Sequence, residues 1–337
     1  MVNALEAPTA VHWHGVRLTN SMDGAPPLTQ APILPGASFD YRFVAPDAGT
    51  FWYHAPGFSG TALYGALIVE EPQPPDVDQE ATLIYGEPYD PHLSLSRLLK
   101  VNGVDTHTIN AAPNERLRLR LINATAAQIL RLRLAELRPF VVGIDGQPAQ
   151  PFAARQGEFM LGPGNRIDAV VDCTLAPGRT TSMTILDTER IEHRPVVTIQ
   201  REAKAPARPT PRDAPKSLPP NPLPERMDFR NAERFEAATG RADPDKNAAL
   251  RFVVNRGRTV MLTVSNPTSE NGFIHLHGHG FRLLDALDDG WKPFWLDTMP
   301  IAPKGKARIA FVADNPGKWL IEGLVTQGRA GVRFEVT

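Results

Sequence analysis

The stretch Phe273-Ile274-His275-Leu276-His277-Gly278-His279-Gly280-Phe281 places three of the chain's nine histidines within five residues. A second pair, His12 and His14, lies near the N-terminus in His12-Trp13-His14-Gly15. Residues two apart on a β-strand point to the same face, so each pair can direct two imidazoles to one point. Imidazole is a common ligand of copper, zinc, iron and nickel. The two pairs therefore predict a metal cluster where two distant segments of the chain meet.

The composition argues against several classes of protein. A chain of 337 residues is long enough for two or three domains. Its formal net charge of −1 argues against a nucleic-acid-binding protein, which needs a basic surface. The sequence contains no apolar run near the roughly 20 residues of a membrane-spanning helix, so no membrane span is expected. The single cysteine, Cys173, allows no internal disulfide.

The N-terminal segment Met1–Pro8 has neither the charged region nor the apolar region of a signal peptide. The chain as written is therefore expected to stay in the cytoplasm. The first histidine motif begins only twelve residues into the chain. A β-sandwich normally has strands before that point, so we expect an incomplete first domain.

Many short segments of alternating polarity, such as 117–121, 260–264 and 308–312, indicate an all-β protein. The 33 prolines and 26 glycines supply turn signals between such segments. Repeated short strands with Gly/Pro turns are typical of stacked β-sandwiches.

We expect four segments along the chain. Residues 1–73 form a partial first domain, 74–202 a second domain, 203–247 a proline-rich linker and 248–337 a third domain. Eight prolines between Pro206 and Pro224 make the linker extended and semi-rigid. A linker of that length lets the third domain fold back against the first and bring the two histidine pairs together. Residues 228–246 leave room for a short helix.

Further motifs accompany the histidine pairs in a characteristic order. They are Met22-Asp23-Gly24, Gly49-Thr50-Phe51-Trp52-Tyr53-His54, Leu161-Gly162-Pro163-Gly164-Asn165-Arg166 and Asn315-Pro316-Gly317-Lys318-Trp319. Together with the histidine motifs, this set covers nearly all of the chain and resembles the multicopper oxidases of the laccase type. The resemblance implies tandem cupredoxin-like domains with a Greek-key β-sandwich fold. It also implies copper as the cofactor, and phenols, aromatic amines or cuprous ions as substrates that are oxidised while oxygen is reduced to water.

The resemblance assigns roles to individual residues. The metal ligands that it implies are His12, His14, His54, His275 and His277. Of these, His12 and His275 match type 2 copper ligands, and the other three match type 3 ligands. Asp23 matches the acidic residue that assists proton delivery to reduced oxygen in the family, which makes it a candidate proton donor.

Several ligands of the family pattern are absent. The family has type 1 or type 3 histidines at the positions that here carry Gly272, Pro56, Glu322 and Leu324. No cysteine or histidine follows His279, so the thiolate of the type 1 site is absent as well. A second acidic helper of the family falls near Thr326. Because a blue-copper site requires a cysteine with two histidines, no type 1 copper is expected.

We therefore expect a multicopper-oxidase-like protein that binds one copper ion at a residual histidine site between the first and third domains, with Glu322 as an additional candidate ligand. The family's route of electron entry is lost, so laccase-type oxidation is expected to be abolished or weak, and whether the chain is an enzyme stays open. One alternative is a metal-free cupredoxin scaffold that binds partners in the bacterial envelope. Another is a truncated product of a decayed oxidase gene. Family members are typically periplasmic, which the resemblance implies here too, and the sequence gives no indication of oligomeric state.

The remaining candidates are expected to be structural. His279 matches a family position that is not a ligand. Cys173, in Val170-Val171-Asp172-Cys173, is expected to be a small core residue. Three histidines lie outside any motif and are expected at the surface or in loops: His92, His107 and His193.

Overall fold

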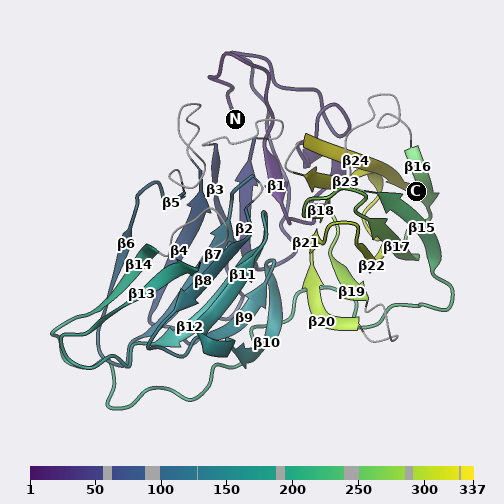
Figure 1. The fold of residues 1–337 in the computed structure, drawn as a ribbon. Coiled ribbons are helices and arrows are strands. Elements are labelled where there is room, and N and C mark those ends of the chain that lie inside the picture. The colour runs from purple at the N-terminus through teal and green to yellow at the C-terminus, as the bar shows by residue number, and fades with distance from the viewer. Residues whose placement is uncertain are drawn as a thin grey trace.

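The computed structural model describes residues 1–55, 63–87, 99–126, 128–186, 194–238, 250–284, 291–325 and 328–337. Within these ranges the chain is built from β-strands, and the only helices are two short 3₁₀ turns, η1 (Asn20–Met22) and η2 (Arg155–Gly157). The all-β class predicted from the sequence is confirmed. No helix in the described part of the chain is long and apolar enough to cross a membrane. The strands form five sheets in three units (Figure 1).

The first unit contains a three-stranded antiparallel sheet that carries the first histidine pair. Its strands, in sheet order, are β1 (His12–His14), β2 (Gly49–His54) and β3 (Tyr64–Val69). Strand β1 pairs with β2 so that His12 lies opposite His54 and His14 lies opposite Trp52. His12 and His14 are buried, whereas Trp13 between them is half-buried on the other face, as the two-residue period of a strand requires. The sheet thus supplies three imidazoles from two adjacent strands.

The second unit is a β-sandwich of two sheets. The larger sheet contains, in order, β10 (Gln147–Ala153), β9 (Phe140–Ile144), β12 (Arg166–Asp172), β7 (Arg116–Asn123), β4 (Gln79–Gly86) and β5 (Lys100–Val101). The smaller sheet contains β11 (Glu158–Leu161), β8 (Leu130–Leu134), β13 (Thr180–Leu186), β14 (Arg194–Arg201) and β6 (His107–Ala111). Apolar side chains from both sheets form one core between them.

Strand β7 is buried on both faces for two different reasons. Its leucines at 117, 119 and 121 enter the core of the sandwich. The alternating Arg118 and Arg120 lie on the other face, where both bind the carboxylate of Asp168 on β12. Arg120 also donates a hydrogen bond to the hydroxyl of Thr50 on β2. Charged residues on one face of β7 therefore join the second unit to the first.

The third unit is another sandwich. One sheet contains β15 (Glu233–Ala238), β17 (Thr259–Ser265), β22 (Lys306–Val312), β19 (Phe281–Leu284) and β20 (Trp291–Leu296). The other contains β16 (Leu250–Val254), β24 (Gly328–Val336), β23 (Gly317–Val325), β18 (Gly272–Leu276) and β21 (Thr298–Ile301). Strand β18, which carries His275, lies between β23 and β21, and apolar side chains from both sheets form the core.

The short helix expected within 228–246 is wrong for the described part of that segment. Residues Glu233–Ala238 form β15, an edge strand that pairs in parallel with β17. Phe235 and Ala237 face the core of the third unit, while Arg234 and Glu236 are exposed. This alternation has the two-residue period of a strand, and the free edge of β17 provides the pairing partner.

The proline-rich segment 203–232 contains no strand and lies against the second sandwich. Arg208 and Arg212 both form ion pairs with Asp78. Farther along, Asn221 donates a hydrogen bond to the carbonyl of Ala48 in the first unit. The segment is therefore attached to both units that it passes.

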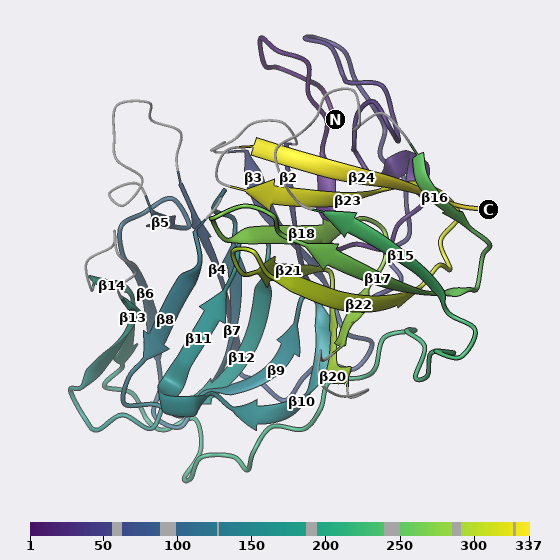
Figure 2. The same cartoon turned by 45° about the vertical axis from the view of Figure 1, so that its right-hand side comes forward.

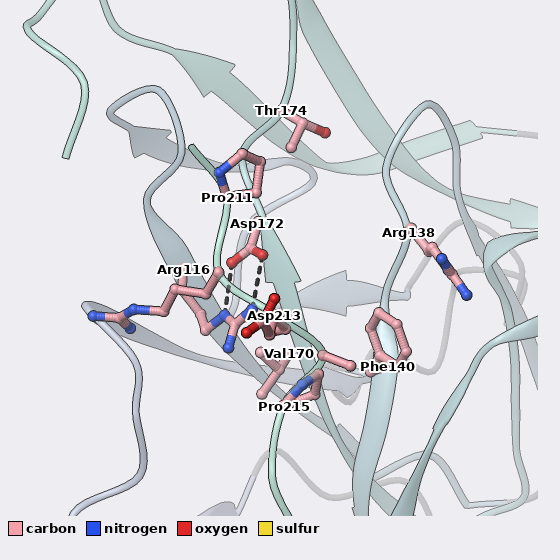
Figure 3. A pocket seen from close by; sticks show the side chains of 11 residues that line it. Arg116, Arg138, Phe140, Val170, Asp172, Thr174, Pro211, Asp213 and Pro215 are labelled. Atoms are coloured by element: carbon pink, nitrogen blue, oxygen red, sulfur yellow. Dashed lines mark hydrogen bonds and ion pairs between the residues drawn. The ribbon is translucent and has the colours of Figure 1, made fainter. Parts of the chain in front are cut away.

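A pocket of about 350 Å³ lies under this segment (Figure 3). Pro211 and Pro215 of the segment line one side of it, and the larger sheet of the second unit lines the other. Arg116 forms a two-bond ion pair with Asp172 on its floor and also donates to the carbonyl of Asp213. The charges on this side of the pocket are thus used to attach the linker.

The first sheet lies between the two sandwiches. Strands β2 and β3 run beside β12 and β4 of the second unit, and η1 lies against β23 of the third (Figure 1). Figure 2 shows the same arrangement with the strands of the third unit brought forward. The histidines of β1 and β18 come into ring contact at the border of the first and third units.

Candidate metal centre

The five histidines assigned from the sequence meet at one buried place. They come from β1, the end of β2, and β18 with the turn that follows it, and none is more than 8% exposed. Three overlapping groups have potential ligand atoms within 4.8 Å of one another: His12 with His14 and His54, His12 with His275 and His277, and His14 with His275 and Asp297. Residues more than 260 positions apart, such as His12 and His275, are thus brought together.

His12 and His275 face each other with their Nε2 atoms 3.1 Å apart. The Nδ1–H of His12 donates to the carbonyl of Asp23 at 2.8 Å, and the Nδ1–H of His275 donates to the carbonyl of Asp297 at 3.1 Å. We assign these tautomers because a carbonyl can only accept. Each neutral ring then has its lone pair on Nε2. Two lone pairs face each other across 3.1 Å, which requires a proton or a metal ion between them.

His14 is oriented in the opposite sense. Its Nε2–H donates at 2.8 Å to the hydroxyl of Thr298, which in turn donates its own proton to Asp297 at 2.8 Å. The lone pair of His14 is therefore on Nδ1, which has no hydrogen-bond partner among the described residues. Burial, followed by the charge of His275, holds the pKa of His14 well below its usual value, and burial lowers the pKa of His275 to about 4. Both rings are neutral at neutral pH, the form that binds a metal.

His277 and Asp23 form a buried pair. The Nδ1–H of His277 donates to Oδ2 of Asp23 at 2.9 Å, and its Nε2 lies 3.9 Å from Oε2 of Glu322. Burial alone would lower the pKa of His277, but Asp23 and Glu322 outweigh it and raise the pKa to about 9. Burial would raise the pKa of Asp23, but His277 and His12 hold it well below its usual range. Asp23 thus acts as an acceptor that anchors two rings, and its role as a proton donor stays a prediction.

His54 completes the group from β2. Its ring stacks on Trp52 with the centroids 4.6 Å apart. The same ring lies 5.3 Å from His12 and 5.8 Å from His14, measured between centroids. Trp52 also packs against His14, with the ring centroids 5.0 Å apart. The buried indole therefore forms an apolar wall behind two of the imidazoles.

Three residues without a role in the sequence analysis hold the cluster from outside. Arg166 binds the carboxylate of Asp297 through two hydrogen bonds of 2.8 and 2.6 Å. Thr298 then links Asp297 to His14 and to His275. Arg166 was visible only as the last residue of a turn motif. No sequence signal joined it to Asp297, because the two are 131 positions apart.

Two glycines permit this close packing. At Gly15, where φ is +83°, a Cβ atom would collide with both members of the Arg166–Asp297 pair. At Gly164, where φ is +85°, a Cβ atom would lie 2.8 Å from Cε1 of His14. The left-handed backbone favours glycine at both positions, and the lack of a side chain lets the units approach β1.

The other residues considered from the sequence do not join the cluster. His279 is buried among aromatic rings and donates from Nδ1 to the carbonyl of His277 at 3.0 Å, and burial lowers its pKa to about 4. Cys173 is fully buried in the core of the second sandwich, as expected. His107 lies on β6 and is partly exposed. Residues outside the described ranges are Pro56, His92, His193 and Thr326, and the side chain of Leu324 is likewise not described.

The donor set fits a metal ion such as copper, which imidazole nitrogens suit. Two nitrogens about 2.0–2.1 Å from one ion lie roughly 3 Å apart. The 3.1 Å between the Nε2 atoms of His12 and His275 matches that separation. The rings of His12, His14, His275 and His277 also donate from their second nitrogen to a carbonyl, hydroxyl or carboxylate. Such bonds orient most metal-binding histidines. The residues that could hold the ion are His12, His14, His54, His275 and His277.

Comparisons of the sequence with known proteins agree along the chain. Three family models, each described as multicopper oxidase, match residues 1–74, 47–205 and 218–325. The chain is 30% identical over 398 aligned residues to the multicopper oxidase MmcO of Mycobacterium tuberculosis, a match that covers 95% of this chain and 75% of that protein. A match to Laccase-3 of Oryza sativa is 31% identical and covers 53% of this chain but only 37% of that protein.

The fold is also similar to solved structures. The crystal structure of a multi-copper oxidase from Pseudomonas thermotolerans superposes with a TM-score of 0.85 at 28% identity. The superposition covers 100% of this chain and 88% of that chain. The first sheet and the two sandwiches therefore follow the tandem cupredoxin-like architecture expected from the sequence.

Proposed function

The chain belongs to the multicopper oxidase family, and on that premise we propose that it binds one copper ion at the histidine cluster and forms no type 1 copper site. Copper is the cofactor that the family implies, and the cluster offers it imidazole ligands from two units. Without the type 1 site, laccase-type oxidation of a substrate with reduction of oxygen is abolished or weak in this chain.

The facing Nε2 atoms of His12 and His275 carry this proposal. Both rings are buried, both donate through Nδ1 to main-chain carbonyls, and both lone pairs point into one gap of 3.1 Å. A buried polar group left without a partner costs about 1–3 kcal/mol. A cation in the gap removes that cost for both nitrogens at once. The unpaired Nδ1 of His14 adds a third acceptor to the same cluster.

The position of the single cysteine supports the absence of a type 1 site. Cys173 is fully buried in the second sandwich, its Sγ lies 4.0 Å from the carbonyl of Ala111, and burial raises the pKa of its thiol. None of the three potential ligand groups in the described part of the chain includes it. Gly272, which stands where the family has a type 1 histidine, begins β18 and has no side chain to offer. A blue-copper centre needs a cysteine thiolate with two histidines.

The residues around the cluster have separate roles in this proposal. Copper supplies one-electron redox chemistry when it is bound. Asp23 orients His277 through its Nδ1, and Thr298 orients His14 through its Nε2. Burial of the five imidazoles excludes bulk water from the cluster. Glu322, 3.9 Å from the Nε2 of His277, is the nearby candidate for an oxygen ligand.

Substrate and location follow from family membership alone. We propose phenols, aromatic amines or cuprous ions as electron donors for any turnover that remains. A periplasmic location is proposed on the same basis. Relatives of the chain carry the names multicopper oxidase and laccase, which is consistent with copper chemistry of this kind.

The copper-to-protein ratio by elemental analysis tests the proposal. Protein that is reconstituted anaerobically with cuprous ion and desalted is expected to retain about one copper per chain, without the colour of a blue-copper site. His275→Ala is expected to lose this copper, because it removes one of the two facing nitrogens. His107→Ala, on the partly exposed β6, is the matched control and is expected to retain it. A ratio near zero in the wild-type chain, or equal ratios in the wild type and His275→Ala, would contradict the proposal.

A metal-free scaffold is the second candidate, and the His277–Asp23 pair favours it. Asp23 and Glu322 overcome the effect of burial and raise the pKa of His277 to about 9. This ring is therefore protonated on both nitrogens, and positively charged, at neutral pH. The border of the first and third units would then hold without copper, and the protein would act through its surface. An unfolding transition that does not respond to added copper would favour this candidate.

A further inference from the structure

We propose that Arg166, a residue of the second sandwich, is a positioning residue that decides which nitrogens of His14 and His275 face the cluster. It acts through Asp297 and Thr298 of the third unit. The consequence for copper affinity rests on the proposed function, but the placement of the ring protons concerns the chain itself. The second unit supplies none of the five histidines, and through Arg166 it still controls how the site presents its donors.

The first step is the fixed geometry of the Arg166 guanidinium. Its Nη1 and Nη2 donate to the two carboxylate oxygens of Asp297 at 2.8 and 2.6 Å. Its Nε donates to the carbonyl of Thr50 at 3.2 Å, and Nη1 also donates to the carbonyl of Gly164 at 3.0 Å. Every nitrogen of this fully buried side chain is thus bonded, and the four contacts reach all three units. A planar fork held in this way fixes the plane of the carboxylate.

The second step is the direction of the Thr298 hydroxyl. Oδ1 of Asp297, held by Arg166, accepts the hydroxyl proton at 2.8 Å. A hydroxyl has only one proton, so the oxygen of Thr298 can only accept from the two rings beside it. Those rings are His14, through Nε2 at 2.8 Å, and His275, through Nδ1 at 3.0 Å. The same carboxylate oxygen lies 3.4 Å from the first nitrogen and 3.5 Å from the second, which also favours a proton on each.

The third step is the consequence for the cluster. With protons fixed on Nε2 of His14 and Nδ1 of His275, the lone pairs of the two rings lie on their other nitrogens. Those nitrogens are the unpaired Nδ1 of His14 and the Nε2 of His275 that faces His12. If the carboxylate of Asp297 turned, the hydroxyl of Thr298 could donate to His14 instead. The ring would then hold its proton on Nδ1, and its lone pair would point away from the cluster.

The placement of Arg166 is specific to this role. It is the first residue of β12 and follows the turn in which Gly164 lies against the ring of His14. Arg118, on the neighbouring strand β7, is also fully buried, but its carboxylate partners are Glu71 and Asp168 instead of Asp297. The two arginines therefore form a matched pair: both join units of the fold, and only one reaches the histidines.

The test is the tautomer of His14 in chelator-treated, ¹⁵N-histidine-labelled full-length chain, read from long-range ¹H–¹⁵N correlations. His14 and His275 are assigned through His14→Gln and His275→Gln. The wild type is expected to show a single tautomer at each ring. Arg166→Lys keeps the charge but loses the fork, and it is expected to give a mixture at His14. Arg118→Lys is the control and is expected to leave both rings unchanged. Unchanged rings in Arg166→Lys would overturn the proposal.

A second readout is the cuprous dissociation constant, measured by competition with a chromophoric chelator. Loss of an outer hydrogen-bond partner typically weakens metal binding by about 10–100-fold. That weakening is expected for Arg166→Lys and not for Arg118→Lys, and equal affinities for the two variants would count against the proposal. If the wild type takes up no copper, the proposed function fails, while the tautomer measurement still decides the role of Arg166.

Thr298 provides the test if Arg166→Lys does not fold. Thr298→Val removes the accepting hydroxyl with little change of volume, and it is expected to give the same mixture at His14. Thr298→Ser restores a hydroxyl and is expected to restore the single tautomer. A wild-type pattern in Thr298→Val would overturn the proposal.

Discussion

The first unit contacts its neighbours through two polar seams, which differ in how their hydrogen-bond donors and acceptors are matched. The arginine seam joins it to the second unit and consists of Thr50, Glu71, Glu80, Arg118, Arg120 and Asp168. The histidine seam joins it to the third unit and consists of His12, His14, His54, His275 and His277. In the arginine seam donors meet acceptors. In the histidine seam acceptor nitrogens converge on one another.

The two seams show how a buried structural network differs from a buried candidate metal site. Polar groups in protein interiors are nearly always paired, and the arginine seam follows this rule except at Nε of Arg118, with bonds such as Arg118 to Glu71 at 2.6 Å. The histidine seam does not, because the lone pairs at its centre have no donor among the described residues. Apart from the exposed Glu80, the residues of both seams are buried, so it is the match between donors and acceptors that distinguishes the histidine seam as the candidate site.

Breaking the arginine seam should give the largest loss of stability. Arg118→Gln leaves the buried Glu71 without its cation, and removal of one partner of a buried pair costs about 3–5 kcal/mol. Denaturant unfolding of the metal-free chain measures this loss. The copper-to-protein ratio under native conditions should not change. A variant that lost its copper while still folded would show that the two seams are not independent.

Binding of cuprous ion at the histidine seam should give the next largest change in the free energy of unfolding. A ligand that binds only the folded state at a free concentration of 100 times its dissociation constant adds about 2.7 kcal/mol to the free energy of unfolding. We expect cuprous ion to do this for the wild type and for Arg118→Gln alike, measured anaerobically. His12→Ala should gain nothing, because it lacks one of the two facing nitrogens. An equal gain in His12→Ala would place the copper elsewhere.

A side chain placed against the Arg166–Asp297 pair, which supports the histidine seam, should have a smaller effect on stability. Gly15→Ala puts a Cβ atom into the Arg166–Asp297 pair at a positive φ, and strain of this kind costs about 1–3 kcal/mol. The matched control is Gly178→Ala, where φ is +72° but no atom lies within 4 Å of the added Cβ. Gly15→Ala should therefore lose more stability in thermal unfolding and should also bind copper more weakly. The same results for both variants would exclude a special role for Gly15.

Removing the side chain of Cys173 should have the smallest effect on stability and none on copper content. Cys173→Ala trims a small side chain in the core of the second sandwich, which is expected to cost about 1 kcal/mol. Copper content and the visible spectrum should be the same as in the wild type, since Cys173 belongs to none of the potential ligand groups. Elemental analysis and absorption spectra make the comparison. Loss of copper in this variant would mean that the thiol takes part in binding.

The histidines could be found from the sequence because their pattern is local. Two residues on one face of a strand are fixed by the period of the backbone, and His12 and His14 lie on β1 with Trp13 turned away. The motif order then supplied His54 and Asp23, both of which lie in the cluster. Gly/Pro turn signals and the alternation of polar and apolar residues were also sufficient to predict the all-β class.

The residues that support the cluster could not be predicted in this way, because their contacts join segments far apart in the sequence. Arg166 and Asp297 meet from different sandwiches, and Thr298 reaches a ring 284 positions away. Their roles depend on directions of single hydrogen bonds, which no spacing encodes. Strand β15 was missed for a related reason, since the free edge of β17 decides that Glu233–Ala238 becomes a strand.

X-ray absorption at the copper edge identifies the elements bound to copper in the reconstituted chain, and so decides whether the histidine seam holds the ion. We predict nitrogen and oxygen neighbours at about 2.0 Å with the outer signals of imidazole, and no sulfur at about 2.3 Å. Arg118→Gln should give the same spectrum as the wild type. A sulfur neighbour, or copper without imidazole signals, would contradict a histidine seam that binds copper without a thiolate.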